Sequence, residues 1–181
     1  HIAEALVRWL APILCFTAEE IWAALPGERP PSVMLGQWHQ LPHVEAGAND
    51  PDWPRILEVR EAVAKELERL RENGVIGSAL EADVTLYCDG ALRDSLNDLG
   101  EELRFVLITS EARVRAGTDR DPAASAAESI DGLWIGAVAS ADPKCSRCWH
   151  RRADVGSDAT HPEICGRCIS NLAAGETRRF A

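Results

Sequence analysis

Four of the six cysteines in this chain of 181 residues stand in two pairs near its C-terminal end. Each pair has the spacing Cys-x-x-Cys, and sixteen residues separate the two pairs. Such a turn lets two thiolates reach one ion, and a second turn at this distance completes a tetrahedron of sulfur around Zn²⁺. Four thiolates leave no open coordination position for a substrate. The pattern therefore predicts one structural zinc ion, with the ligands Cys145, Cys148, Cys165 and Cys168.

Other interpretations of the cysteines find less support. Two disulfides would suit an exported protein, but the chain has no apolar run long enough to span a membrane and no basic segment followed by an apolar one. We therefore expect a cytoplasmic chain that contacts no membrane. His150 is a weak alternative ligand, because four thiolates already satisfy the ion. Cys15 and Cys88 are isolated in apolar segments, which predicts two buried thiols with a structural role.

The formal net charge of −10 argues against a protein that coats nucleic acid through bulk electrostatics. From Lys144 onward the chain has seven basic and four acidic residues, a net charge of +3. The preceding 143 residues have twelve basic and 25 acidic residues, a net charge of −13. The arginines near the cysteines can form a local patch that faces phosphates, or they can be ordinary solvated side chains.

Sequence motifs of catalysis are missing. The chain has no Gly-rich phosphate loop, no Gly-x-Ser-x-Gly elbow and no His-Glu-x-x-His motif. No nucleophile stands at a recognised spacing from a base. We therefore expect a chain without an active site of its own.

Hydrophobic periodicity predicts the elements that precede the cysteines. Residues 1–25 have apolar side chains at helical spacing, and Pro12 should divide them into two helices. Thr17 and Glu20 have the spacing of a capping box, which would start the second helix. The proline-rich segment 26–54 predicts a long surface connection whose tryptophans pin it to the helices.

A third helix is expected over 54–73, with Asp52 as its N-cap and Asn73-Gly74 as its left-handed C-cap. The period of the apolar residues then changes from 3.6 to 2, which indicates strands. We predict a short helix over 91–99 and strands near 84–88, 105–108, 112–116 and 133–138. The predicted fold class is α+β, with a helical segment over 1–74, a small α+β linking module over 75–140 and a four-cysteine zinc ribbon over 141–181.

Three segments of the tail share a pattern that extends beyond the cysteines. They are Lys144-Cys-x-Arg-Cys-Trp-His150, Glu163-Ile-Cys-Gly-Arg-Cys168 and the closing Gly175-Glu-x-Arg-Arg-Phe-Ala181. Together they resemble the C-terminal end of bacterial-type isoleucyl-tRNA synthetases. The family's catalytic chemistry is carried by motifs of the HIGH and KMSKS types, and neither motif occurs here.

Four segments before the tail extend this resemblance over nearly the whole chain. Leu10-Ala-Pro-Ile-Leu and Phe16-Thr-Ala-Glu-Glu-Ile-Trp22 resemble the end of the helical anticodon-binding domain, which the isoleucyl, valyl, leucyl and methionyl enzymes share. Ile76-Gly-Ser-x-Leu-Glu-Ala82 and Glu101-Glu-Leu-Arg-Phe-Val106 resemble the segment that precedes the zinc tail in the isoleucyl enzymes. The opening segments are specific only to the class, whereas the tail narrows the resemblance to isoleucine.

The resemblance implies a part of an isoleucine–tRNA ligase, an enzyme that attaches isoleucine to its tRNA with ATP. ATP binding, catalysis and editing would belong to upstream domains, so this chain would be inactive by itself. Its implied partners are those upstream domains and the anticodon stem-loop of the isoleucine tRNA, with no contact to DNA. Single-stranded RNA loops are recognised by stacking and base-edge hydrogen bonds, while arginines hold the phosphates.

The resemblance implies RNA contacts from side chains that the metal would fix in place. These candidates are Trp149, Arg147, Arg151, Arg152 and Arg167. Trp149 has an alternative structural role, since a tryptophan beside a ligand can shield a zinc–sulfur cluster. Two other functions also remain open. DNA-repair glycosylases have a similar terminal zinc finger, although they need a basic DNA-binding body, and the tail could also be a packing platform without RNA contacts.

Overall fold

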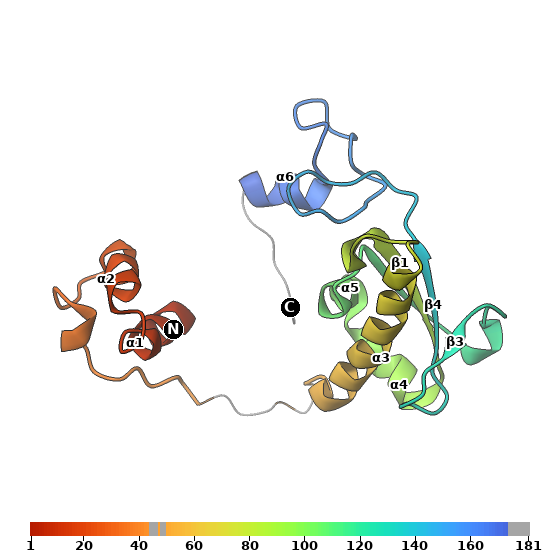
Figure 1. Ribbon diagram of the computed structural model, residues 1–181, viewed down its shortest axis with the longest axis horizontal. Helices are drawn as coiled ribbons and strands as arrows, with labels where there is room; N and C mark the ends of the chain where they lie inside the picture. Colours follow the sequence, from red (N-terminus) through yellow and green to blue (C-terminus); the bar gives the residue numbers. More distant parts are fainter. Residues whose placement is uncertain (44–46, 48–49, 174–181) are drawn as a thin grey trace. The chain divides into compact units, whose positions relative to one another are not determined.

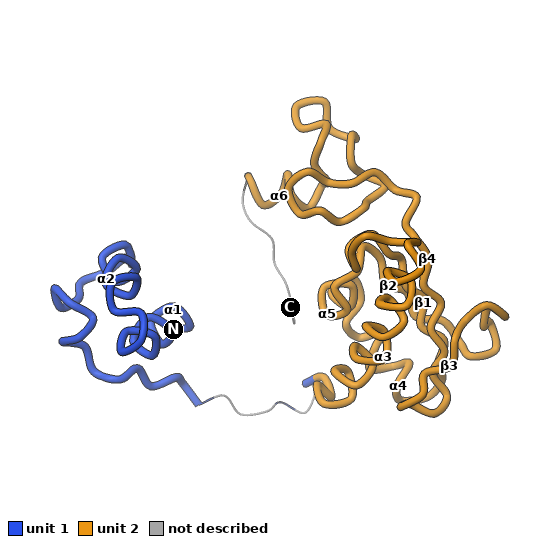
Figure 2. Tube along the Cα trace, viewed as in Figure 1, with its two compact units in different colours: residues 1–50 blue, residues 51–181 orange. Residues whose placement is uncertain are grey.

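The computed structural model describes residues 1–43, 47 and 50–173 of the chain (Figure 1). The chain divides into two compact units, His1–Asp50 and Pro51–Ala181, and each has a hydrophobic core (Figure 2). No helix in this described part is long and apolar enough to cross a membrane. The closing motif over 175–181 lies outside the described residues.

The first unit consists of the helices α1 (Ile2–Leu10) and α2 (Cys15–Ala24) and the 3₁₀ helix η1 (Val33–Leu35). Trp22 is the centre of its core, and the indole N–H donates to the backbone oxygen of Pro30 at 2.8 Å. This hydrogen bond satisfies the polar group that burial of the ring would otherwise leave unpaired.

The structure confirms the predicted break between the two helices of this unit and corrects other predictions. Pro12 lies in the turn between α1 and α2, as expected. Thr17 is not a cap, because Leu14 is the residue that precedes α2 and its N–H still donates to the last residue of α1. Cys15 is exposed rather than buried, because the small core around Trp22 does not reach the start of α2.

Much of the apolar surface of the first unit faces outward. Ile2, Ile13 and Phe16 are largely exposed on or between α1 and α2. Trp38 is also exposed, so it does not pin the connecting segment as predicted. Apolar surface of this kind is typical of a region that another part of a protein covers.

The second unit begins with α3 (Trp53–Glu72), and both ends of this helix agree with the prediction. The Asp52 carboxylate accepts the N–H of Arg55 at 3.2 Å, and Gly74 follows the C-cap with a φ of +70°. A left-handed residue at this point is easiest for glycine, which has no Cβ to clash. The inner face of α3 is fully buried at Ile56, Val59 and Val63.

A four-stranded sheet with the order β2-β1-β4-β3 forms the centre of the second unit. Its strands are β1 (Ala82–Tyr87), β2 (Glu111–Arg115), β3 (Ser125–Ala126) and β4 (Trp134–Ala139). β1 pairs parallel with β2 and antiparallel with β4, and β4 pairs antiparallel with β3. The predicted strands near 84–88, 112–116 and 133–138 are therefore confirmed, and so is the α+β fold class.

The crossover from β1 to β2 contains α4 (Gly90–Asp98) and α5 (Leu103–Leu107). Short 3₁₀ turns lie before β1, before α5 and after β2: η2 (Ala79–Glu81), η3 (Gly100–Glu102) and η4 (Gly117–Asp119). The predicted strand over 105–108 is wrong, because this stretch is α5 and its C-cap. A short, continuous apolar run has no period that separates a strand from a buried helical turn.

The core of the second unit joins α3 to the sheet. Leu67 of α3 belongs to one buried cluster with Leu86 of β1 and Leu107 of α5. The first compact unit therefore ends at residue 50, whereas the sequence division ended the first segment at residue 74. The apolar stripe of α3 explains the difference, since it packs on the sheet of the second unit. The three-part division into functional domains stays a prediction.

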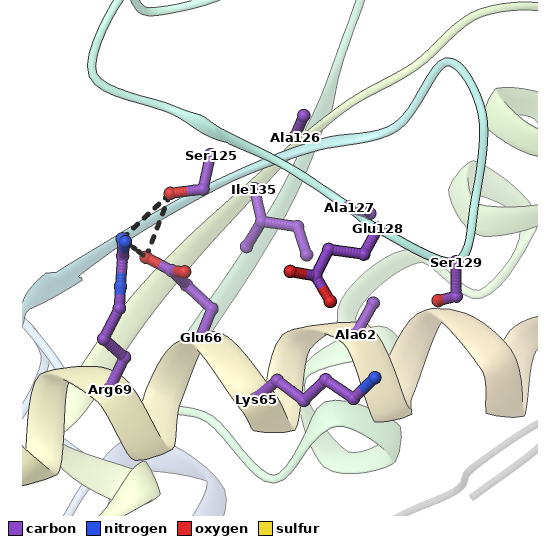
Figure 3. Close-up of a pocket in the computed structure, with 10 residues that line it drawn as sticks. All are labelled: Ala62, Lys65, Glu66, Arg69, Ser125, Ala126, Ala127, Glu128, Ser129 and Ile135. Atoms are coloured by element: carbon purple, nitrogen blue, oxygen red, sulfur yellow. Dashed lines mark hydrogen bonds and ion pairs between the residues drawn. The ribbon is translucent and has the colours of Figure 1, made fainter.

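A pocket of about 270 Å³ lies where α3 meets β3 and the segment that follows it (Figure 3). Its polar side chains connect the two elements: Arg69 donates to Ser125 Oγ at 2.9 Å, and Glu66 accepts from both residues. These three side chains satisfy one another, and their hydrogen bonds hold the short edge strand β3 against α3.

Candidate metal centre

The four predicted ligands come together in space. Their sulfur atoms all lie within 4.8 Å of one another, with Cys145 and Cys168 3.8 Å apart and Cys148 and Cys165 3.7 Å apart. A tetrahedral site with Zn–S bonds of about 2.3 Å requires sulfur–sulfur distances of about 3.8 Å. None of the six cysteines, all of which lie in described residues, forms a disulfide. This donor set fits a four-coordinate metal ion.

Residues 144–172, here called the cysteine module, build this centre from two turns. In the first turn the Trp149 N–H donates to the Cys145 oxygen at 3.0 Å, and the Cys145 N–H donates to the His150 oxygen at 2.9 Å. The second turn leads into α6 (Gly166–Ala173), and the Asp154 carboxylate accepts the Gly166 N–H at 2.9 Å. Backbone hydrogen bonds thus bring both pairs of sulfurs to one point.

Electrostatics at the sulfurs favour the thiolate of Cys145 and oppose the thiolates of Cys148 and Cys165. Burial disfavours ionisation of Cys145, but backbone N–H groups of Cys148, Cys165 and Arg147 outweigh it and lower the pKa of Cys145 to about 6. Burial raises the pKa of Cys148 and of Cys165. Several thiolates at this spacing need a cation among them, and a coordinated metal deprotonates its thiols outright.

Trp149 lies on the surface of the cysteine module. It is 60% exposed, its φ is +66°, and Lys144 Nζ is 5.5 Å from the centre of its ring. A positive φ is a genuine outlier for a bulky side chain, because Cβ then approaches the backbone. The conformation therefore costs stability and directs most of the indole to solvent.

The four candidate arginines differ in what they contact. Arg147 is exposed, and its guanidinium donates to the Cys168 sulfur at 3.6 Å. The other three also make contacts within the second unit. Arg151 Nη1 donates to the Asp142 oxygen at 3.1 Å, Arg152 Nη1 donates to Glu111 at 3.0 Å, and Arg167 stacks on Phe105 at 4.6 Å.

His150 fills space beside the metal centre and is not among the clustered ligand atoms of the described residues. It is buried, its Nδ1 lies 3.2 Å from the Cys148 oxygen, and its ring meets Phe105 edge to face with centroids 5.6 Å apart. Burial lowers the pKa of His150, and the charge of Arg104 lowers it further. A neutral imidazole therefore packs the module against α5.

Ser110 fastens the cysteine module to the sheet, a role that the sequence analysis missed. This fully buried residue stands directly before β2, and its hydroxyl donates to the Leu80 oxygen at 2.5 Å and accepts the Arg151 N–H at 2.5 Å. One side chain thus joins η2, β2 and the first cysteine turn. A single serine directly before a strand has no sequence pattern from which such a contact could be predicted.

Replacing this hydroxyl should loosen the module. We expect Ser110→Ala to reduce the free energy of unfolding of the second unit by about 1–3 kcal/mol, because two buried backbone groups lose their partner. Denaturant unfolding checks the magnitude, and hydrogen exchange at Arg151 should accelerate. Ser157→Ala is a matched control, since that exposed hydroxyl donates only to the Asp154 oxygen. Equal effects of the two variants would contradict the role of Ser110.

Comparisons with known proteins find matches for both the helical N-terminal segment and the cysteine module. Residues 1–86 match the family model of the anticodon-binding domain of tRNA ligase, and residues 142–171 match the model of a zinc finger found in FPG and IleRS. Isoleucine–tRNA ligases of Halorhodospira halophila and Pseudomonas putida are 53% identical to the whole chain, and that of Methylococcus capsulatus is 51% identical over 99% of it. The chain spans 20% of the length of each of these relatives.

Proposed function

Because the chain belongs to the isoleucine–tRNA ligase family, of whose members it spans about one fifth of the length, we propose that it holds the anticodon stem-loop of the isoleucine tRNA. The observation that carries this proposal is a matched anticodon-binding segment followed by a cysteine module with an exposed indole. ATP-dependent attachment of isoleucine, and editing, would take place in upstream domains of the longer ligase, in the cytoplasm. The chain by itself would catalyse neither reaction.

The proposed metal is one structural Zn²⁺ ion bound by Cys145, Cys148, Cys165 and Cys168. The sulfur spacing and the match to a zinc-finger model support this choice of ion. A bound Zn²⁺ would fix the two turns relative to each other. The residues of the turns would then meet RNA in a set geometry without a cost in ordering them.

Stacking on an RNA base is the proposed role of Trp149. A side chain that shielded the metal would be buried, whereas most of this indole is exposed. Glycine would relieve the strain of a positive φ, so a tryptophan at this position needs a compensating use. A base stacked on the indole would supply one, and such stacking is tolerant of base identity.

Arg147 is the strongest phosphate-contact candidate among the proposed arginines, because it is exposed whereas the other three are half-buried. Arg151, Arg152 and Arg167 make contacts inside the second unit, which gives each a structural role as well. We therefore propose RNA contact for all four, with Arg147 the most accessible of them. This ranking predicts different consequences when single arginines are removed.

The exposed apolar side chains of α1 and α2 support an upstream partner within the same enzyme. Ile2, Ile13 and Phe16 would pack against further parts of the longer ligase, which would remove them from water. Burial of such side chains contributes roughly 1.5–3 kcal/mol each. The first unit would thereby be attached to further parts of the longer ligase.

The test of this function is direct binding. We expect the zinc-loaded chain to bind isoleucine tRNA more tightly than an unrelated tRNA, with an affinity that falls as salt rises. Arg147→Ala should weaken this binding about 3–10-fold and reduce the salt slope by about one, since one phosphate contact is lost. Fluorescence anisotropy at several salt concentrations measures both quantities, and metal analysis shows whether zinc is retained.

A matched control for charge is Arg71→Ala, which removes an exposed arginine from α3. Unchanged affinity in Arg147→Ala, with zinc retained, would favour the second candidate function, a packing platform without RNA contacts. The internal contacts of three of the arginines support that alternative. A DNA-repair finger finds less support, since residues 1–86 match an anticodon-binding domain.

A further inference from the structure

Three arginines from different segments converge where the cysteine module meets α5. Arg104 comes from α5, Arg152 follows the first cysteine turn and Arg167 belongs to α6. The guanidiniums of Arg104 and Arg167 lie over the ring of Phe105, with their central carbons 4.0 Å and 4.6 Å from its centroid. Arg104 is only 6% exposed, which is unusual for a charged residue.

Glu111 and Glu101 are two carboxylates near this cluster, and they pair with it at different distances. Glu111 pairs with Arg152 at 3.0 Å, a normal hydrogen-bond distance. Glu101 Oε2 lies 3.7 Å from Arg104 Nε and 3.6 Å from Arg152 Nη2, and both distances are too long for hydrogen bonds. Arg104 Nε makes no hydrogen bond within the described residues. Burial, and then the charge of Arg152, lower the pKa of Arg104, so an anion at this point would stabilise the charged guanidinium.

Glu101 is the least constrained member of this arrangement. Its side chain is 75% exposed, and it stands in the short turn η3, directly before α5. An exposed carboxylate at such distances gains little from its ion pairs. When it rotates into solvent, Arg104 and Arg152 both face the space that it occupied. Guanidinium groups arranged around one point match the oxygens of a phosphate, which can accept several charged hydrogen bonds at once.

We propose that Arg104 and Arg152 form a binding site for a backbone phosphate of RNA, in which the phosphate displaces the carboxylate of Glu101. Arg167, whose guanidinium also lies over the Phe105 ring, adds positive charge. The identity of the ligand rests on the proposed RNA-binding function, whereas the anion site itself rests on the geometry of the cluster. Glu101 would keep the arginines ordered until RNA arrives.

The test compares two charge-neutralising variants of the zinc-loaded chain. Glu101→Gln removes the competing carboxylate, and Glu68→Gln is the control, because it removes a carboxylate that also pairs with an arginine, on α3. The first probe is inorganic phosphate, followed by NMR of the arginine Nε–H signals. Glu101→Gln should lower the dissociation constant for phosphate about 3–10-fold and increase the shift of the Arg104 signal. Glu68→Gln should leave both unchanged.

The second probe is isoleucine tRNA, for which Glu101→Gln should tighten binding by a similar factor and steepen the salt dependence. If Glu101→Gln behaves like Glu68→Gln with inorganic phosphate, the anion site is overturned. If phosphate binding responds and tRNA binding does not, the RNA assignment is overturned while the anion site stands. A chain that binds no tRNA in any variant, yet binds phosphate at Arg104, would separate failure of the RNA function from failure of the site.

Discussion

Cys145→Ser should abolish zinc retention and unfold the cysteine module. Cys145 is fully buried, its sulfur is 3.8 Å from that of Cys168, and it accepts the Cys165 N–H at 3.4 Å. The module has only a small apolar cluster besides its cysteines, so the metal must supply most of its folding free energy. Structural zinc sites contribute on the order of 10–16 kcal/mol in small fingers, and a three-thiolate site loses much of this.

Two measurements check this outcome. Metal analysis after dialysis should fall from one zinc per chain to none, and hydrogen exchange should become fast across residues 144–172. The strands β1, β2 and β4 should stay paired, because their core lies apart from the cysteines. Cys15→Ser is the matched control, since it changes an exposed cysteine in the other unit. A Cys145→Ser chain that keeps stoichiometric zinc would refute the assignment of the four ligands.

Trp149→Gly should separate the stability of the cysteine module from its affinity for RNA. Base–aromatic stacking contributes about 1–3 kcal/mol, so loss of the indole should weaken binding to isoleucine tRNA roughly 5–150-fold. The same change should stabilise the module, because glycine accepts a φ of +66° without a Cβ clash. Trp149→Ala should lose similar affinity but gain no such stability.

Comparing Trp149→Gly with Trp149→Ala distinguishes stacking on RNA from shielding of the metal. Affinity is measured by titration of fluorescent tRNA, and stability by the rate at which a chelator removes zinc. If the indole shields the metal instead, both variants should release zinc faster while tRNA affinity changes little. Retained affinity in both variants, with normal zinc release, would exclude both roles. Trp149→Phe should keep part of the affinity, since a smaller ring still stacks.

The metal centre and α3 could be predicted from the sequence because each depends on local patterns. Two Cys-x-x-Cys turns predict that their four sulfurs lie close together, since four sulfurs can surround one ion in few ways. Asp52 and Gly74 mark the ends of α3. The Asp52 carboxylate accepts a backbone N–H at the start of the helix, and Gly74, which has no Cβ, adopts the left-handed conformation after its end. The alternating pattern of β1 likewise reflects its own burial.

Features that depend on long-range packing were not predictable in this way. The stretch 105–108 was expected to be a strand, but tertiary contacts place it in α5, with Ile108 as a left-handed cap. Cys15 was expected to be buried, but the burial of a side chain depends on how far the neighbouring core extends. Ser110 and Arg104 meet the cysteine module across more than forty positions of sequence, and no local period reports such a contact.

The contact between Ser110 and Arg151 has a thermodynamic consequence for the sheet. A ligand that binds only the folded state stabilises whatever unfolds together with its site, by about 1.4 kcal/mol for each tenfold rise in its free concentration above the dissociation constant. The Ser110 hydroxyl joins η2 and the start of β2 to the first cysteine turn. Part of the stabilisation by a bound metal ion therefore extends to strands that contain no metal ligand. The melting temperature of the sheet should therefore follow the free zinc concentration.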